Sequence, residues 1–400
     1  MKVCLLNSFY EPDILGGAEI SVKILAEKLN ELGIETFVVS TGDVDKVEYI
    51  NKVKVYRVNI GSNITAKKYV TNDYNGRLKK LKYKLLEIKN PIVKIKLQRI
   101  FHQERPDIIH VNNIYGISTE VWNVSNKMNI KVLQTLRDYF LICPKSTLSC
   151  NEKCECSMIC KIYRKTFNSL TKKIDYVTAP SKYVIDEFTS RGYFKDIENE
   201  CVYNAIDIDI EKLESTYVKK ISKEINEINF IYLGALSEHK GLLELIKSFK
   251  LIEHNNIRLH IAGKGQLEEF VRKASQEDNR IQYHGFIQGE KLERLLMGSD
   301  ILVAPSLWNE PFGRIVLDAY KFAMPVIVSN KGGLPEIVEH KNTGIVLEEV
   351  TVESIKNALT YFIDNKEIIK LMLNNTQKKI LNFTIEKQVK EFIKIYEYLL

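Results

Sequence analysis

The sequence predicts an α/β protein of two domains. Short apolar runs, typical of buried parallel strands, alternate with helical patterns along the whole chain. The length of 400 residues suits two domains rather than one. In each half of the chain a strand ends in the same sequence, Ala-Pro-Ser, at 179–181 and again at 304–306. These observations predict the α/β class and favour two domains.

The first half begins with a βαβ unit. Strands are expected at 2–7 and 35–40, with a helix at 20–32 between them. Gly16 and Gly17 lie at the turn from strand to helix, where their backbone amides can approach a ligand closely. The spacing Gly-x-Gly-x-x-Gly is absent, so this turn does not predict a dinucleotide. Further strands are expected at 53–58, 107–113, 131–135 and 174–179.

The second half repeats the alternation after a junction at 201–207, from which we expect a linker to extend through Asn229. A helix pattern follows Thr384 and runs to Leu400. Strands are expected at 229–234, 258–263, 281–286, 300–304 and 325–329, with a helix at 242–249.

The composition is that of a soluble globular protein, with 45% hydrophobic and 27% charged residues. No apolar run reaches the roughly 18 residues of a membrane span. The N-terminus predicts a first strand and not a signal peptide. Seven cysteines, an odd number in a long chain without export signals, favour a reducing compartment. We therefore expect a cytoplasmic protein.

A basic segment runs from Arg77 to Arg99, with nine Lys or Arg residues against one acid, Glu87. Apolar residues are interleaved with the charges, as in amphipathic helices. One interpretation is a solvated helix face. The other is attachment to an anionic membrane, here the inner face of the plasma membrane, which attracts each nearby cation by about 1 kcal/mol. Nucleic acid is not predicted, because no aromatic interleaving or binding motif accompanies the charges.

The stretch 300–319 predicts a strand, a loop and a helix in succession. The apolar run ends at Ala304, Pro305 stops the strand, and Gly313 opens a helical pattern. In open parallel sheets a ligand binds at the carboxyl end of a strand and faces the next helix N-terminus. The unpaired amides of residues 312–315 are therefore expected to hold a diphosphate without a metal.

Two carboxylates flank this predicted anion site. Glu310 is in the loop, and Asp318 lies eight positions later in the helix. Carboxylates beside an anion site are explained if they accept hydrogen bonds from hydroxyl groups, such as those of a sugar and a ribose. The alternative is a helix N-terminus that caps itself with Glu310.

The sequence Glu310-Pro-Phe-Gly, followed by the acid at 318, resembles the acidic signature of family 4 retaining glycosyltransferases. The motif Gly-Gly-Leu-Pro-Glu at 332–336 adds to the resemblance, which extends along nearly the whole chain. The family usually has Glu at the second acidic position, where this chain has Asp318.

The resemblance implies the GT-B fold, in which two doubly wound, Rossmann-like lobes face each other across a cleft. Residues 1–205 would form an acceptor-binding lobe and residues 206–380 a nucleotide-sugar-binding lobe. Residues 381–400 would form a C-terminal helix that returns to the first lobe.

The resemblance also implies donor-binding residues. Lys240 occupies the position of the family's phosphate-binding lysine, whereas the family's usual arginine is Ala235 here. Arg314 is a candidate to compensate. Lys240, Glu310 and His110 are the catalytic candidates. The expected donor-binding residues are Gly16, Gly17, Lys240, Phe286, Glu310, Phe312, Gly313, Arg314, Ile315 and Asp318.

The acceptor side departs from the family pattern. Where relatives often have His-x-His, this chain has His110 followed by Asn112, and His110 alone is also compatible with a core histidine. Asn112 and Asn113 can bond a sugar hydroxyl. The family's His-Asp-Tyr is Arg137-Asp138-Tyr here. Arginine stays protonated and cannot act as a base, but it can bind a phosphate or a charged sugar.

Five of the seven cysteines fall in one short segment. The spacing fits no usual zinc pattern, because Cys154 and Cys156 are too close. A metal that orders a loop near the acceptor and a loop of thiols without metal both stay open. The five are Cys143, Cys150, Cys154, Cys156 and Cys160.

Taken with the resemblance, these residues predict a retaining transferase. It would move a sugar from a UDP- or GDP-sugar to a glycan or lipid-linked glycan in cell-surface polysaccharide synthesis. We expect no cofactor, and no metal at the diphosphate. Two alternatives stay open: a nucleotide-sugar epimerase on the same fold, and a catalytically silent nucleotide-sugar-binding protein.

Overall fold

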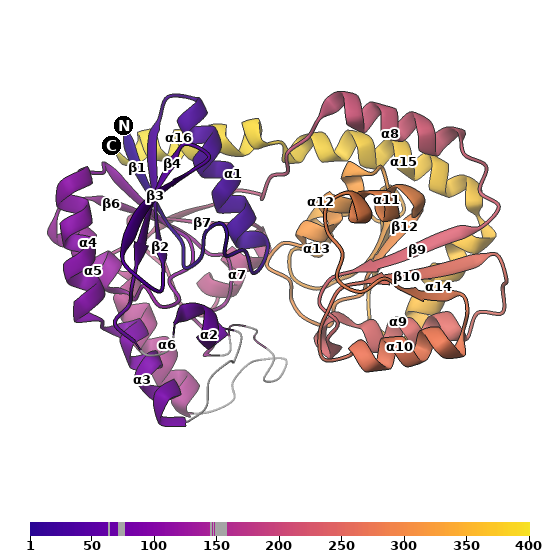
Figure 1. Ribbon diagram of the computed structural model, residues 1–400, viewed down its shortest axis with the longest axis horizontal. Helices are drawn as coiled ribbons and strands as arrows, with labels where there is room; N and C mark the ends of the chain where they lie inside the picture. Colours follow the sequence, from indigo (N-terminus) through magenta and orange to yellow (C-terminus); the bar gives the residue numbers. More distant parts are fainter. Residues whose placement is uncertain (63–64, 71–76, 145, 147, 149–157) are drawn as a thin grey trace. The chain divides into compact units, whose positions relative to one another are not determined.

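A computed structural model describes residues 1–62, 65–70, 77–144, 146, 148 and 158–400, without the side chains of 69–70 and 77–82. The chain divides into two compact units. Unit 1 contains Met1–Ala205 together with Ile385–Leu400, and unit 2 contains Ile206–Thr384. Each unit has one sheet covered by helices, which confirms the predicted α/β class (Figure 1).

The sheet of unit 1 has the strand order β3-β4-β2-β1-β5-β6-β7-β8. Every described pair of neighbours is parallel except β3 and β4. In the central register Leu5 lies between Val38 and His110. The order reverses beside β1, so the loops after β1 and β5 meet at a topological switch point. The strands are β1 (Lys2–Leu6), β2 (Glu35–Thr41), β3 (Lys46–Ile50), β4 (Val53–Val58), β5 (Ile108–Val111), β6 (Lys131–Thr135), β7 (Tyr176–Ala179) and β8 (Glu198–Cys201).

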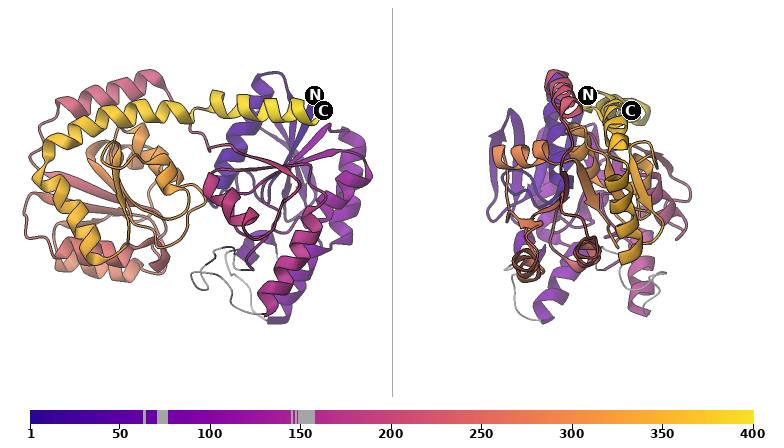
Figure 2. Two further views of the ribbon diagram at one scale, coloured as in Figure 1. Left: turned by 180° about the vertical axis from the view of Figure 1, so that it is seen from behind. Right: turned by 90° about the vertical axis from the view of Figure 1, so that its right-hand side faces the viewer.

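The last helix of the chain belongs to unit 1. Helix α16, the last yellow helix in Figure 2, lies against the rest of unit 1. Its apolar stripe, which includes Phe392 and Tyr396, packs into the core formed by α1, β1 and β2. Residues 381–384 stay with unit 2. The helices of unit 1 are α1 (Gly17–Glu31), α2 (Ala66–Val70), α3 (Arg77–Ile88), α4 (Pro91–Glu104), α5 (Glu120–Lys127), α6 (Met158–Thr171), α7 (Lys182–Thr189) and α16 (Ile385–Leu399).

Unit 2 has a sheet of six parallel strands in the order β11-β10-β9-β12-β13-β14. Its order reverses between β9 and β12, which places the loops after these two strands together. The strands are β9 (Ile228–Leu233), β10 (Ile257–Ala262), β11 (Ile281–Tyr283), β12 (Ile301–Ala304), β13 (Val326–Ser329) and β14 (Gly344–Leu347). The helices are α8 (Ile210–Ser222), η1 (Glu238–Lys240), α9 (Leu242–Lys250), α10 (Glu268–Glu277), α11 (Glu290–Gly298), α12 (Arg314–Lys321), α13 (Leu334–Ile337), α14 (Val352–Asp364), α15 (Lys366–Ile380) and η2 (Leu381–Phe383).

The linker expected through Asn229 is instead largely helical, which corrects that prediction. Helix α8 begins after Asp209, whose side chain accepts a hydrogen bond from the Lys212 amide. The helix buries Leu213 and also Lys220. The Lys220 ammonium donates to the carbonyls of Leu296 (3.2 Å) and Ser299 (2.6 Å) at the end of α11. This polar helix is thus held in unit 2 by its buried Leu213 and by Lys220, which caps α11.

Candidate active site

The candidate site of unit 2 is built by the loops after β9 and β12. The first loop leads through η1 into α9, and the second leads into α12. The two loops touch at Gly241, which has a φ of 70°. A Cβ atom at this position would lie 1.9 Å from the Pro305 carbonyl oxygen. The close approach therefore requires glycine and fixes Lys240 beside the β12 loop.

Lys240 and Glu310 form an ion pair between these loops. The Ser306 hydroxyl donates to the same Glu310 carboxylate oxygen (3.2 Å). The Lys240 ammonium also lies 4.8 Å from the ring centroid of Trp308, a cation–π distance. The sequence brought Lys240 and Glu310 together through the family resemblance, but it did not single out Ser306 or Trp308. The sequence signal that could have indicated them was their position, because Ser306 and Trp308 lie in the same loop as Glu310.

The Glu310 backbone is supported from behind by the turn after β13. The Gly333 amide donates to the Glu310 carbonyl (2.7 Å). A Cβ atom on Gly332 would lie 2.1 Å from that carbonyl oxygen. The Gly-Gly pair at 332–333 therefore lets this turn press against the Glu310 loop and hold the carboxylate in place.

Helix α12 begins after Gly313, which has a φ of 101°. Arg314 and Asp318 lie one turn apart on it, and both are half-buried. Burial raises the pKa of Asp318, and the nearby Arg314 guanidinium opposes that rise. A guanidinium and a carboxyl group thus lie in the first turns of the helix whose amides were predicted to bind a diphosphate.

The side chains of two predicted donor-binding residues, Phe312 and Ile315, pack into the core of unit 2. The Phe312 side chain is buried and packs against Phe383, with ring centroids 6.1 Å apart. Ile315 packs against the same core. Their side chains hold α12 to the sheet, so only their backbone amides stay candidates for donor binding.

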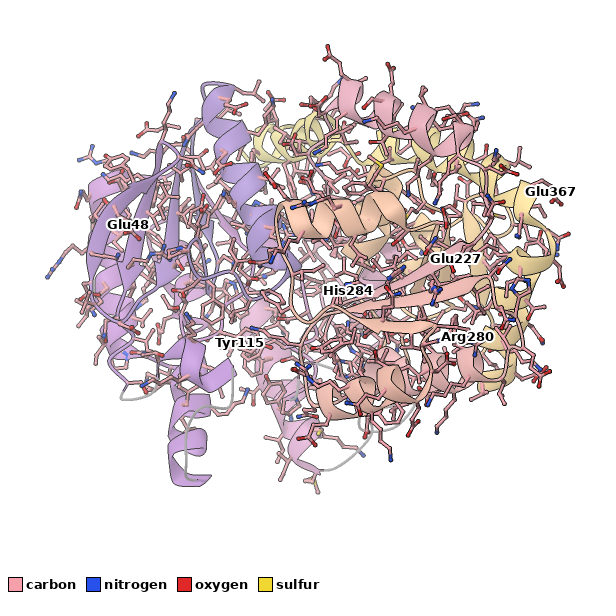
Figure 3. The ribbon with its side chains drawn as sticks, turned by 45° about the vertical axis from the view of Figure 1, so that its right-hand side comes forward. Glu48, Tyr115, Glu227, Arg280, His284 and Glu367 are labelled. Carbon is pink, nitrogen blue, oxygen red and sulfur yellow. The ribbon has the colours of Figure 1, made fainter. Side chains whose placement is uncertain are left out.

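Phe286 lies apart from Lys240 and Glu310, in the loop after the edge strand β11. Its ring is exposed, and the Lys264 ammonium lies 4.7 Å from the ring centroid. Just before it, the Nε2 atom of His284, labelled in Figure 3, lies 3.0 Å from Nδ1 of His260. An exposed aromatic face beside a cation is suited to stacking on a nucleobase.

In unit 1, Gly16 and Gly17 form the start of α1. The Gly16 amide donates to the carboxylate of Glu19 (2.7 Å), which is the half of a capping box that a glycine N-cap allows. Glu19 is buried, and burial raises the pKa of its carboxyl. The helix start is therefore already occupied by an internal carboxylate. Glu19 was missed from the sequence, although an acid three residues after the cap is a known capping signal.

Four predicted acceptor-side residues gather at the carboxyl edge of the unit 1 sheet. The Arg137 guanidinium donates to Asn112 Oδ1 (2.8 Å) and to Asn204 Oδ1 (2.5 Å). The Asn113 amide donates to Asn7 Oδ1 (3.0 Å). Because these contacts join the ends of β1, β5 and β6, the structure brings the predicted residues into one cluster. Asn204 was not predicted as part of it.

Asp138, next to Arg137, is the fourth member of this cluster. Its carboxylate accepts a hydrogen bond from the Phe140 amide (2.8 Å). Burial raises the pKa of Asp138 to about 6. A cavity of about 10 Å³, lined by Asn112, Asn113, Arg137 and Asp138, leaves room for about one water molecule.

His110 is a core residue in this structure. Its side chain is 0% exposed. One ring nitrogen lies 2.8 Å from the Tyr396 hydroxyl and the other 2.6 Å from Thr135 Oγ1. Burial lowers the pKa of the imidazole well below its usual value. Both ring nitrogens are thus engaged inside unit 1, and the contact with Tyr396 fastens α16 to the sheet, as the core-histidine interpretation predicts.

The cysteine segment lies mostly outside the described residues. Cys143 and Cys160 are buried in unit 1, and Cys150, Cys154 and Cys156 are not described. Within the described parts of the chain, no group of three or more His, Cys, Asp or Glu side chains is arranged to hold a metal ion. The metal hypothesis for the cysteines stays a prediction.

Comparison with known families identifies the class of protein. The model of the Glycosyltransferase Family 4 matches residues 15–210, and that of the Glycosyl transferases group 1 matches residues 214–379. The chain therefore belongs to the group 1, family 4 glycosyltransferases, which confirms the predicted family.

Individual relatives are consistent with this family. An uncharacterized 42.6 kDa protein in the cps region of Klebsiella pneumoniae is 28% identical over 404 residues, covering 99% of this chain and 100% of that protein. The Escherichia coli UDP-Gal:alpha-D-GlcNAc-diphosphoundecaprenol alpha-1,3-galactosyltransferase is 29% identical over 202 residues, 47% of this chain and 52% of that protein. The crystal structure of Anabaena Alr3699/HepE in complex with UDP has a TM-score of 0.73 at 16% identity and covers 100% of both chains. This likeness confirms the predicted GT-B fold.

None of the described helices combines the length and apolar character that a bilayer span requires.

Proposed function

We propose that this protein is a retaining, metal-independent glycosyltransferase. It transfers a sugar from a UDP- or GDP-sugar to a hydroxyl group of a glycan or lipid-linked glycan in cell-surface polysaccharide synthesis. The observation that carries this proposal is the Lys240–Glu310 ion pair, formed where the loops after β9 and β12 meet.

Unit 2 is proposed to bind the nucleotide sugar. When the anomeric bond breaks, negative charge grows on the leaving diphosphate. In this proposal Lys240, the first amides of α12 and Arg314 stabilise that charge. Glu310 is suited to accept hydrogen bonds from the sugar hydroxyls, and Asp318 from the ribose.

Retention follows if the acceptor attacks the face from which the diphosphate departs. Bond breaking between the anomeric carbon and the phosphate oxygen then runs ahead of bond formation to the acceptor oxygen. The leaving phosphate takes the acceptor's proton, so no protein base is needed. This fits His110, whose ring nitrogens are engaged in the core, and Arg137, which stays protonated.

The acceptor-side cluster of unit 1 is proposed to bind the acceptor. Arg137 is positioned by two amide oxygens, and Asp138 lies beside it. A guanidinium held in this way suits a phosphate or a charged sugar, and Asp138 suits a hydroxyl group. The Escherichia coli relative acts on a diphosphoundecaprenol-linked sugar. A lipid-linked acceptor would place this protein at the membrane surface, with the segment from Arg77 to Arg99 as its basic face.

A donor panel tests the proposal. The purified protein is mixed with UDP- and GDP-sugars, and thermal stabilisation identifies the donor, because a ligand that binds only the folded state raises apparent stability. Release of the nucleoside diphosphate is then measured with and without acceptor, for the wild type and for Glu310→Ala. Acceptor-dependent release that Glu310→Ala abolishes supports the transferase. An epimerised sugar without acceptor would indicate an epimerase, and binding without turnover a silent binding protein.

A further inference from the structure

Helix α6 of unit 1 presents an apolar surface at its N-terminal end. Met158, Ile159 and Ile162 lie on its outer side and are exposed by 73%, 72% and 60%. Ile162 shares a helix face with both of the others, because it lies four positions after Met158 and three after Ile159. Exposed aliphatic side chains gathered in this way are typical of an interaction site and not of a solvated helix face.

Within α6, whose residues are all described, every charged side chain is a cation. Lys161 and Lys165 are exposed beside it. The helix sequence from Met158 to Thr171 contains no Asp or Glu, and Lys172 and Lys173 follow directly. An aliphatic centre with a rim of lysines matches the interface of an anionic bilayer, where acyl chains lie below negatively charged headgroups.

The basic segment of α3 and α4 has the same character. Its one acid, Glu87, is only 1% exposed and pairs with Lys84 inside unit 1 (3.0 Å). Leu85 and Ile95 are exposed on the outer side. From residue 83 to residue 99, where side chains are described, no carboxylate reaches the surface.

Helices α3 and α6 both contact the loop that carries the acceptor-side cluster. The Lys84 ammonium of α3 lies 5.1 Å from the Phe140 ring centroid. The Tyr163 hydroxyl of α6 donates to the Phe140 carbonyl (2.6 Å). Tyr115, labelled in Figure 3, packs on the same ring. Helices α3 and α6 extend to the same end of unit 1 in Figures 1 and 2.

We propose that the N-terminal end of α6, with Met158, Ile159 and Ile162 inserted, docks unit 1 on an anionic lipid bilayer together with the outer face of α3 and α4. The acceptor loop packed between these helices would then lie at the lipid surface. A second copy of this chain is a poor occupant, because two lysine-rimmed surfaces repel each other. Nucleic acid would call for exposed aromatic or hydrogen-bonding groups in place of these aliphatic side chains.

Vesicle flotation of the full chain, without donor, tests the docking surface. Vesicles contain phosphatidylcholine alone or phosphatidylcholine with about 30% phosphatidylglycerol, enough to give an anionic surface. The wild type is expected to float with the anionic vesicles and not with the neutral ones. The variant M158S/I159S/I162S should bind them at least about tenfold more weakly, since three inserted aliphatic side chains are lost.

A matched control removes three comparably exposed apolar side chains from unit 2, Val218, Leu251 and Leu371. The variant V218S/L251S/L371S should float like the wild type. A second readout does not depend on a loss of vesicle binding. In I159W, brominated lipid should quench the fluorescence of the new tryptophan by more than it quenches Trp122 and Trp308 in the wild type.

Equal flotation of both triple variants would overturn the proposal, as would equal binding to neutral vesicles. So would a wild-type dimer in light scattering that M158S/I159S/I162S converts to a monomer. The link to the acceptor rests on the proposed function, but flotation is measured without turnover. Failure to dock and failure to transfer sugar are therefore separate results.

Discussion

The Lys240 ammonium and the Glu310 carboxylate are paired across 70 residues of sequence. The cation expected to bind the diphosphate is thus held by the acid expected to bind the sugar. An arriving donor would replace one partner by another: its diphosphate would take over Lys240, and its hydroxyl groups would donate to Glu310. The ion pair keeps both side chains in position until then, and it keeps the charge of Lys240 compensated.

Substituting the two partners should separate binding from transfer. Lys240→Met removes the cation, so the affinity for UDP or GDP should fall about tenfold or more, or about 1.4 kcal/mol. Glu310→Gln removes the competing carboxylate and leaves Lys240 to the diphosphate. Its nucleotide affinity should be equal to or higher than that of the wild type, while acceptor-dependent turnover falls at least about a hundredfold. Titration calorimetry and turnover assays measure the two quantities.

Lys331→Met is the control for nucleotide affinity, because it removes a lysine from the loop after β13 without touching the ion pair. The assignment of Lys240 would be wrong if Lys240→Met bound the nucleoside diphosphate as tightly as Lys331→Met does.

A methyl group at position 241 should disrupt the site. In Gly241→Ala the new carbon would meet the Pro305 carbonyl oxygen at 1.9 Å, and the residue would keep a φ of 70°. We expect unit 2 to lose about 3 kcal/mol or more of stability. Nucleotide-dependent stabilisation should weaken as well, because Lys240 moves with the turn. Thermal unfolding with and without UDP or GDP measures both effects.

Gly298→Ala is the matched control for this substitution. Gly298 ends α11, and nothing lies within 4 Å of a Cβ atom there. Alanine in a helix is favourable, so stability should be unchanged or rise by up to about 1 kcal/mol. If Gly241→Ala behaved like Gly298→Ala, the close approach of the two loops would not be a feature of the protein in solution.

The sequence was sufficient for the features that local spacing encodes. Glu310, Gly313 and Asp318 lie within one strand-loop-helix segment, so their pattern is visible without any tertiary information. The contacts of Trp308 with Lys240 and of Asn204 with Arg137 cannot be read from local spacing, because each contact joins loops that are far apart in the chain. Single-sequence patterns do not specify which loops meet; the strand order does.

Strand β3 and helix α8 were not predicted from the sequence, and the physical reason is the same for both. Strand β3 was not predicted, because it is an edge strand whose Val47 and Tyr49 are exposed. Helix α8 was mistaken for a linker because its sequence is polar and its buried face includes Lys220. In both elements the burial that normally gives a hydrophobic period is reduced, and hydrogen bonds to neighbouring elements stabilise the structure instead.

Tyr396→Phe should test whether His110 is structural. The substitution leaves the Nδ1 atom of His110 buried without its hydroxyl partner, which costs about 1–3 kcal/mol. Unit 1 should be less stable, while turnover per folded molecule should stay within about twofold of the wild type, since no group near the substrate changes. Tyr398→Phe, at an exposed position of the same helix, should change neither quantity. A large loss of turnover in Tyr396→Phe, with stability unchanged, would restore His110 as a catalytic candidate.

Glu104 should give unit 1 a measurable acid sensitivity. Its carboxylate accepts hydrogen bonds from Lys54 (2.6 Å) and Tyr56 and pairs with Lys2 (2.7 Å), which ties the end of α4 to β1 and β4. Burial alone would raise the pKa of Glu104, but these hydrogen bonds outweigh it and lower that pKa to about 2. Because the folded pKa lies below the unfolded value of 4.5, the stabilisation is present above pH 4.5 and is lost as the pH falls toward 2.

Glu104→Gln should therefore cost about 1–3 kcal/mol of unfolding free energy at pH 7, and clearly less near pH 2.5, where the wild-type carboxylate is also becoming protonated. Unfolding of unit 1 is followed through the fluorescence of Trp122, which is buried there, in a Trp308→Phe background. Glu35→Gln is the matched control, because Glu35 pairs with the same Lys2 but its side chain is 69% exposed. An exposed pair contributes at most about 1 kcal/mol, so this variant should change little at either pH. Equal losses in the two variants at pH 7 would mean that burial adds nothing to the Glu104 cluster.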